Sequence, residues 1–264
     1  MLCCETYSLH SRFRENTLTL LEVPALFKEL GIPGIAWNDL YFTSWDQEYL
    51  GQLKRAAAEA GCTSCAMIIE GNLATADAEA RKAQIELNIT KLHAASALGI
   101  PVVRINLGRA ESDEDNGTVG VERCIAAFQE LIPIARQLNI KMSIENHGGP
   151  STKGDWILRI IQESDPEWVG SCLDFGNWPA EPAELRYEEI RKLAPYAYHT
   201  HVKTNGFLDN GEEIAVDYER AFDIMKHVGY KRAVSIEWEG KVPTDPVEGV
   251  RMSRDLILRH WPEA

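Results

Sequence analysis

Short apolar runs alternate with longer amphipathic segments along the whole chain. Eight of these runs are rich in aliphatic residues and end near a polar residue or a glycine, a pattern typical of buried strands. Between the runs, apolar residues recur at helical spacing. The predicted strands are Cys3–Leu9, Gly34–Asn38, Ser64–Glu70, Pro101–Leu107, Lys141–His147, Val169–Phe175, Ala197–Lys203 and Ala233–Glu239. The predicted helices include Ala74–Leu98, Val119–Leu138, Glu184–Leu193 and Val247–Arg259.

This alternation predicts an α/β protein with one domain, a single (β/α)8 TIM barrel over residues 1–264. Eight βα units in 264 residues average about 33 residues each, which is the size that such a barrel requires. A doubly wound sheet is the competing fold, but it would normally carry a glycine-rich phosphate turn. Neither GxGxxG nor GxxxxGKS/T occurs in the sequence, and no Pro/Gly/Ser-rich linker divides it. We therefore expect the barrel.

The charge balance argues against two classes of partner. A net charge of −13 and the lack of a Lys/Arg run longer than two residues disfavour nucleic acid, which usually binds a basic stripe. No apolar run approaches the length of a membrane span, so we expect no membrane partner. The first residues, MLCCETYSLH, lack the basic and apolar regions of a signal peptide, which predicts a cytoplasmic protein. A homo-oligomer is compatible with the sequence.

The cysteines are expected to be reduced, partly buried thiols, since a large cytosolic chain needs no disulfide scaffold. Cys62 and Cys65 have CxxC spacing, but no second CxxC or HxxxH accompanies them, so the signal for a zinc or redox site is weak. The six are Cys3, Cys4, Cys62, Cys65, Cys124 and Cys172.

Acidic or imidazole side chains stand at the ends of the last four predicted strands. They are Glu145, Asp174, His201 and Glu237, separated by 29, 27 and 36 residues, about one βα unit each. The carboxyl ends of the strands of a barrel meet at one rim, where the active site lies. Three carboxylates and an imidazole facing one point repel each other strongly unless a cation lies among them. The sequence therefore predicts a metal-dependent enzyme.

The ligand types favour a particular class of ion. Oxygen-rich sites with one nitrogen favour Mn²⁺, with Mg²⁺, Co²⁺ or Zn²⁺ as alternatives. Four protein ligands on an octahedral ion would leave positions for two adjacent oxygens of a hydroxy-ketone or hydroxy-aldehyde. Glu239 shares a strand face with Glu237 and is the alternative ligand on that strand. The candidates for substrate binding are His147, Asn177, His199, Lys203 and Arg104.

The segments SIENHGG, CLDFGNW, YHTHVKTNG and VSIEWEG resemble the motifs of the xylose isomerase-like barrel superfamily, which includes sugar phosphate isomerases and epimerases. The resemblance implies that Glu145, Asp174, His201 and Glu237 bind the metal, and that Glu145 and Glu237 act as paired acid/base groups. Epimerases of this kind carry a sugar-contacting His three residues after the Asp, where this chain has Asn177. The AP endonucleases of the superfamily bind three zinc ions with many more histidines than this chain has.

We therefore expect a divalent-metal-dependent isomerase or epimerase that removes a proton next to the carbonyl of a small sugar or polyol-derived ketone. A first alternative is a lyase on the same scaffold, either similar to inosose dehydratase or able to cleave a keto-glycoside. A second is a non-catalytic sugar-binding accessory subunit, although paired glutamates argue against it. The expected partner is a small carbohydrate substrate.

Overall fold

Eight parallel strands close into one barrel in the order of the sequence, which confirms the predicted fold. The computed structural model describes residues 1–179 and 181–264. Each strand pairs in parallel with the next, and β8 pairs with β1. The strands are β1 (Leu2–Glu5), β2 (Gly34–Asn38), β3 (Thr63–Ile69), β4 (Val102–Ile105), β5 (Lys141–Glu145), β6 (Val169–Asp174), β7 (Ala197–Thr204) and β8 (Val234–Trp238).

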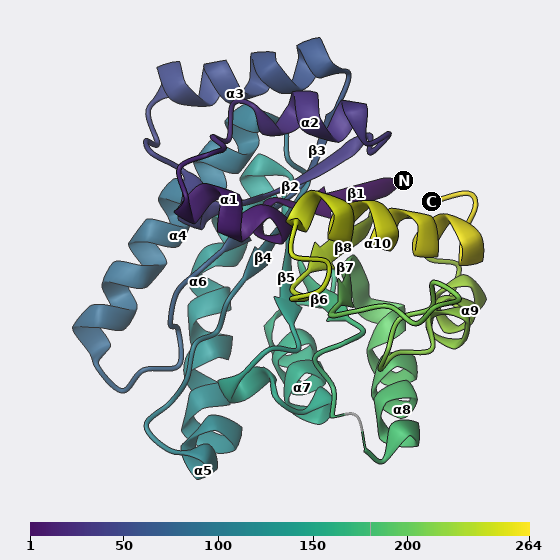
Figure 1. The fold of residues 1–264 in the computed structure, drawn as a ribbon. Coiled ribbons are helices and arrows are strands. Elements are labelled where there is room, and N and C mark those ends of the chain that lie inside the picture. Colours follow the sequence, from purple (N-terminus) through teal and green to yellow (C-terminus); the bar gives the residue numbers. More distant parts are fainter. Residues whose placement is uncertain (180) are drawn as a thin grey trace.

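Helices surround the barrel and connect its strands, and the two chain ends lie near each other beside β1 and α10 (Figure 1). Several helices begin at an Asp whose side chain accepts hydrogen bonds from the first amides, as Asp77 does before α4. The α-helices are α1 (His10–Arg14), α2 (Val23–Glu29), α3 (Gln47–Ala60), α4 (Ala78–Leu98), α5 (Asp113–Asp115), α6 (Val121–Leu138), α7 (Gly154–Ser164), α8 (Ala183–Leu193), α9 (Tyr218–His227) and α10 (Pro246–His260).

The first strand is shorter than the predicted Cys3–Leu9. It ends at Glu5, and the chain continues as the 3-10 helix Thr6–Leu9. The hydroxyl of Thr6 accepts a hydrogen bond from the amide of Asn38 on β2 (2.8 Å), and the hydroxyl of Ser8 accepts one from the amide of Trp238 on β8 (3.0 Å). These hydroxyls take the place of strand carbonyls. The carboxylate of Glu5 therefore stands at the carboxyl end of its strand.

The apolar core lies mostly between the strands and the helices. A smaller apolar cluster consists of strand residues alone, namely Cys3, Ala36, Cys65, Ala66 and Ile68. Beside these small groups, the strands bury polar side chains such as Ser143, His199 and Ser235.

Candidate metal centre

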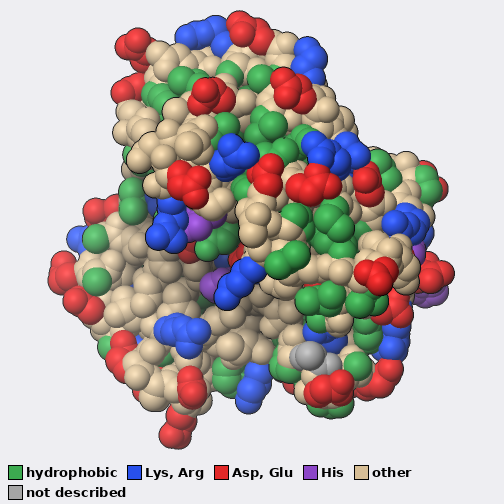
Figure 2. Space-filling model, in the orientation of Figure 1, with side chains coloured by type: hydrophobic (Ala, Val, Ile, Leu, Met, Phe, Trp, Pro, Cys, Tyr) green, Lys and Arg blue, Asp and Glu red, His purple; other side chains and the backbone are tan. Residues whose placement is uncertain are grey.

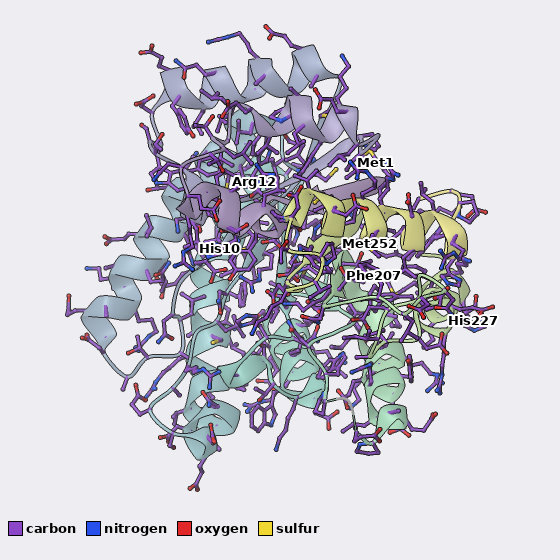
Figure 3. All side chains as sticks on the ribbon, viewed as in Figure 1. Met1, His10, Arg12, Phe207, His227 and Met252 are labelled. Carbon is purple, nitrogen blue, oxygen red and sulfur yellow. The ribbon has the colours of Figure 1, made fainter. Side chains whose placement is uncertain are left out.

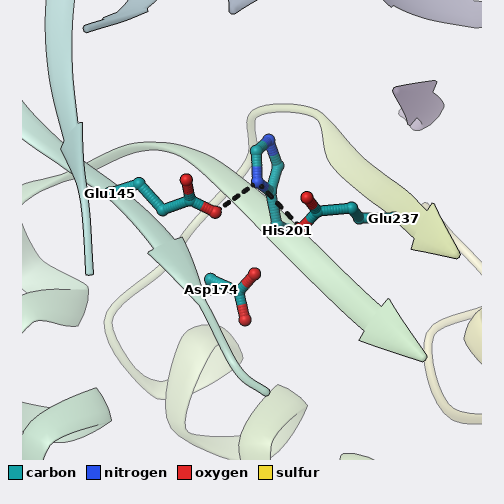
Figure 4. Close-up of side chains that lie close together, drawn as sticks. All are labelled: Glu145, Asp174, His201 and Glu237. Carbon is teal, nitrogen blue, oxygen red and sulfur yellow. Dashed lines mark hydrogen bonds and ion pairs between the residues drawn. The ribbon is translucent and has the colours of Figure 1, made fainter. Parts of the chain in front are cut away.

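The four predicted ligands converge at the carboxyl ends of β5, β6, β7 and β8. Glu145, Asp174, His201 and Glu237 each offer one ligand atom, and these atoms all lie within 4.8 Å of one another. All four side chains are buried. Figure 4 shows Glu145 and Glu237 reaching toward the imidazole of His201 from opposite sides, with Asp174 facing the space between them. We call this group the carboxylate–imidazole cluster.

The imidazole of His201 joins the two glutamates. Its Nδ1 lies 2.8 Å from Glu145 Oε1 and 3.3 Å from Glu237 Oε2. The other oxygen of Glu145, Oε2, accepts a hydrogen bond from the buried guanidinium of Arg104. Arg104 is on β4, the neighbouring strand, so it fixes the Glu145 carboxylate from the side away from the cluster.

Asp174 is oriented by the turn that follows β6. Its Oδ1 accepts hydrogen bonds from the amides of Gly176 (2.6 Å) and Asn177 (2.9 Å). Asn146 holds the backbone of Asp174 by donating to its carbonyl and accepting from its amide, both at 2.9 Å. One carboxylate oxygen is thus used by the protein, and the other, Oδ2, is left for the cluster.

Lys203 brings a positive charge to the same place. Its Nζ lies 3.2 Å from Glu237 Oε2, 3.5 Å from Asp174 Oδ2 and 3.1 Å from Glu239 Oε1. Glu239, the alternative ligand, is about one third exposed and lies outside the group of converging ligand atoms. The structure therefore favours Glu237 over Glu239 as the ligand on β8.

The pKa values of Asp174 and Glu145 are shifted in opposite directions. Burial raises the pKa of the Asp174 carboxyl, and repulsion from Glu237 and Glu145 holds it well above its ordinary value despite Lys203. Burial also opposes ionisation of Glu145, but Arg104 and His201 outweigh it and hold the pKa of Glu145 well below the ordinary value. Arg104, His201 and Lys203 thus offset part of the repulsion among these carboxylates.

The unpaired atoms of the cluster test whether a cation fits. Among the described residues, Asp174 Oδ2 and Glu237 Oε2 are buried and accept no hydrogen bond of good geometry. Buried carboxylate oxygens are normally paired, so two such oxygens beside an imidazole nitrogen fit the ligand set of a divalent cation. The cluster could therefore hold a divalent metal.

The predicted substrate-binding residues have different surroundings. Asn177 Nδ2 lies 3.5 Å from Glu145 Oε1, at the edge of the cluster, and His147 is exposed beyond the end of β5. Arg104 does not face open space, because Glu70 and Glu145 occupy its guanidinium. His199 lies two residues below His201 on β7, and its buried ring meets that of His201 edge to face with 5.4 Å between centroids.

His199 is also placed away from the mouth by the cavity that it lines. That cavity, of about 280 Å³, includes Met1, Thr63 and Pro101, which stand at the amino ends of their strands. Burial, with the nearby charge of His201, lowers the pKa of His199 to about 3, so the ring is neutral. The geometry therefore gives Lys203 and Asn177 access to the cluster and gives His199 a place beneath it.

Two acidic residues of the site were not predicted from the sequence. Glu5 at the end of β1 places Oε2 3.4 Å from His201 Nε2. Glu70, which directly follows β3, accepts hydrogen bonds from Arg104 (2.7 Å) and Asn106 (2.5 Å). In the structure both stand at the end of a strand, as the four predicted ligands do, but the strand predicted to reach Leu9 placed Glu5 in its interior.

A cavity of about 390 Å³ lies beside the cluster, between the segment after β1 and the segment after β8. Its lining includes Tyr7, His10, Trp238 and Glu239, and Glu239 reaches Lys203. Figure 2 shows this face hollowed near its centre, with Lys or Arg and His side chains around the hollow. Cavities of this size accept small ligands.

The other histidines are dispersed. His10 begins α1 and lines the cavity beside the cluster, whereas His227 ends α9 in the helical layer (Figure 3). His10 is engaged by the hydroxyl of Tyr41, at 2.8 Å from Nδ1. All six cysteines are free, as expected. None of the described helices is both long and apolar enough to cross a bilayer.

Comparisons with known proteins agree with this architecture. L-ribulose 3-epimerase superposes with a TM-score of 0.79 and 18% identity over 99% of this chain and 94% of that one. A structure of the IOLI protein with a bound zinc atom gives a TM-score of 0.78 and 15% identity over 98% and 97% of the two chains. At these identities the likeness shows the fold.

One curated relative is similar over a short stretch. The C-glycoside deglycosidase alpha subunit of Arthrobacter globiformis is 32% identical over 82 residues, which cover 29% of this chain and 23% of that subunit. The family model described as the xylose isomerase-like TIM barrel matches residues 24–259. The chain therefore belongs to the xylose isomerase-like TIM-barrel family.

Proposed function

We propose that the protein is a divalent-metal-dependent isomerase or epimerase that removes a proton from the carbon next to the carbonyl of a small sugar or polyol-derived ketone. The observation that carries this proposal is the convergence of three buried carboxylates and an imidazole on one point at the barrel mouth. Family membership and the epimerases among the structural neighbours support it.

Glu145, Asp174, His201 and Glu237 would hold the metal, and Mn²⁺ is the ion that we favour for this ligand set. When bound, a divalent cation polarises a carbonyl and makes the neighbouring C–H bond more acidic. The zinc in the IOLI protein structure supports a metal in this fold.

The two glutamates are suited to different parts of the proton transfer. Both oxygens of Glu145 are engaged, by His201 and Arg104, and its carboxylate is held anionic. Among the described residues, Glu237 Oε1 receives no hydrogen bond, so this oxygen is free to take a proton. The two carboxylates approach from opposite sides (Figure 4). One would take a proton from one face of the substrate carbon, and the other, after taking up a proton from solvent, would return it to the opposite face.

Lys203 and Asn177 complete the polar surface that a substrate would meet. The ammonium of Lys203 contacts the cluster and the cavity residue Glu239, so it can neutralise charge that develops on a substrate oxygen. Asn177 donates an amide toward Glu145 at the place where related epimerases carry His. An amide cannot transfer a proton at neutral pH, so we assign Asn177 to hydrogen bonding of a hydroxyl.

The second candidate is a lyase that removes the same proton and expels an oxygen from the adjacent carbon. Two observations favour it, namely the stretch shared with the C-glycoside deglycosidase alpha subunit and the Asn at position 177. Both candidates begin with the same proton abstraction and differ in the fate of the resulting anion.

Deuterium exchange separates the two candidates. Purified protein with Mn²⁺ is incubated in D₂O with ketoses, inososes and keto-glycosides, and each sugar is then analysed by mass spectrometry and NMR. Isomerisation or epimerisation places deuterium on the carbon next to the former carbonyl. An unsaturated or cleaved product without exchange into recovered substrate would show the lyase. Chelator-treated protein and Glu237→Gln are the controls and should show neither.

A further inference from the structure

The His201 imidazole lies between two sets of carboxylates. Its Nδ1 faces Glu145 and Glu237 in the carboxylate–imidazole cluster, and its Nε2 faces Glu5 Oε2 at 3.4 Å on the opposite side. His201 is 1% exposed and Glu5 is 2% exposed, so water does not compete for either group. Glu5 is not among the converging ligand atoms, and its contact is with the far nitrogen of the ring.

Glu5 is itself held in a defined orientation. Asn38 Nδ2 on β2 donates a hydrogen bond of 2.8 Å to Glu5 Oε1, and the Asn38 amide is bonded to the hydroxyl of Thr6. Oε1 is thereby fixed, and Oε2 points toward His201. Among the described residues, Glu5 Oε2 and His201 Nε2 are both buried without any hydrogen-bond partner. Two unpaired buried groups, an acceptor and a potential donor, face each other.

We infer that Glu5 is a positioning residue that accepts the Nε2 proton of His201 and so keeps Nδ1 free to bind the metal. This inference rests on the metal centre of the proposed function. An imidazole that binds a metal through one nitrogen carries its proton on the other, and a carboxylate acceptor there fixes the tautomer and the ring orientation. The separation of 3.4 Å needs to shorten by about half an ångström to reach an ordinary N–H···O distance.

Metal affinity tests this role independently of catalysis. Mn²⁺ is titrated by calorimetry into chelator-treated wild type, Glu5→Gln, Glu5→Ala and Glu239→Gln. Loss of the acceptor in Glu5→Ala should weaken Mn²⁺ binding by about 10–100-fold. Glu5→Gln keeps a neutral acceptor oxygen and should give a smaller loss. Glu239→Gln also removes one negative charge near the cluster, but Glu239 does not contact the imidazole. The Mn²⁺ affinity of this variant should therefore differ from that of the wild type by less than about threefold.

A second readout observes the proton itself. In the Zn²⁺-loaded wild type, nitrogen-15 NMR of the histidines should show a slowly exchanging Nε2 proton on His201 that disappears in Glu5→Ala. A purely structural role for Glu5 would lower thermal stability without changing this signal or the affinity. Glu5→Gln preserves the side-chain volume, so it serves if Glu5→Ala fails to fold.

The outcomes distinguish this inference from the proposed function. If wild type binds Mn²⁺ and both Glu5 variants bind it equally well with the Nε2 signal unchanged, the role of Glu5 is refuted and the metal centre stands. If wild type binds no Mn²⁺, the metal centre and the role of Glu5 both fall. An equal loss in Glu239→Gln and Glu5→Gln would also refute the inference, because it would reduce the effect to net charge.

Discussion

Lys203 and Glu237 are paired across β7 and β8, and their side chains meet at 3.2 Å inside the barrel mouth. The same ammonium reaches Asp174, so one buried cation serves two of the proposed metal ligands. A divalent ion in the cluster would supply the positive charge that Lys203 supplies in its absence. Lysine and metal are thus partly interchangeable sources of charge for the folded state.

Lys203→Met should therefore destabilise the metal-free protein far more than the Mn²⁺-loaded protein. Removing one partner of a buried charge network costs roughly 3 kcal/mol or more in the free energy of unfolding. Urea denaturation with chelator and with Mn²⁺ measures both states. Lys192→Met is the matched control, since Lys192 pairs with Asp155 and Glu189 at the surface and should cost about 0–1 kcal/mol in either state. An equal loss with and without Mn²⁺ would contradict this view.

Asp174 offers a test of the cluster's repulsion. Asp174→Asn keeps an oxygen for the amides of Gly176 and Asn177 but removes a carboxyl whose ionisation is unfavourable. We expect the melting temperature of the metal-free variant to equal that of the wild type or to exceed it slightly. The increase should correspond to at most about 1 kcal/mol in the free energy of unfolding. The variant should also lose the stabilisation that Mn²⁺ gives the wild type.

Asp174→Ala is the comparison, because it also removes the turn contacts and should melt lower in both states. Thermal denaturation of the three proteins with chelator and with Mn²⁺ gives all the values. A metal-free Asp174→Asn that melts as low as Asp174→Ala would show that the carboxylate has a structural role.

The fold and the four converging residues could be predicted because both follow from local pattern plus topology. Once eight βα units are recognised, a polar residue at the carboxyl end of a strand is expected at the rim of the barrel mouth. The role of Glu5 could not be predicted, because the apolar pattern continues to Leu9 and places Glu5 inside the strand. What ends β1 is hydrogen bonding by Thr6 and Ser8 to other strands, and this is not encoded locally.

Arg104 is a second residue whose contacts could not be predicted from the sequence. Its position on a strand facing the mouth suggested substrate binding, but Glu70 and Glu145 hold its guanidinium. Such pairing depends on neighbours contributed by β3 and β5, and strand periodicity says which face a residue occupies without saying which groups it meets there.

The two glutamates should be indispensable to turnover. Glu145→Gln and Glu237→Gln each retain the side-chain shape and remove a proton acceptor, so each should lower the rate by at least about 10²–10⁴-fold. The loss should persist at saturating Mn²⁺, which separates the proton transfer from metal affinity. Steady-state rates at several Mn²⁺ concentrations check this, with Glu163→Gln as the charge-matched control, because Glu163 pairs with Arg159 at the surface. Recovery of the wild-type rate at high Mn²⁺ would assign the glutamates to metal binding alone.

The contribution of Glu5 to the stability of the metal-free protein should fall as the pH rises. Burial, with the charges of Glu237 and Glu145, raises the pKa of Glu5 from 4.5 to about 8. The folded state therefore holds a proton that the unfolded state releases, so this contribution is complete below about pH 4.5 and is lost as the pH rises through about 8. Gln at this position does not titrate.

The free energy of unfolding of wild type relative to Glu5→Gln should accordingly fall between pH 5 and pH 8, by on the order of 1 kcal/mol or more. Urea denaturation in the presence of chelator at several pH values measures this difference. Parallel curves for the two proteins would show that Glu5 titrates normally in the folded state.

We propose above all that Glu145, Asp174, His201 and Glu237 bind one divalent ion together. A crystal soaked in Mn²⁺, with diffraction recorded on both sides of the manganese absorption edge, tests it most directly. We expect one anomalous peak with an oxygen or nitrogen of each of the four side chains at about 2.0–2.4 Å. A peak elsewhere in the molecule, or two of the four side chains turned away from the ion, would contradict it.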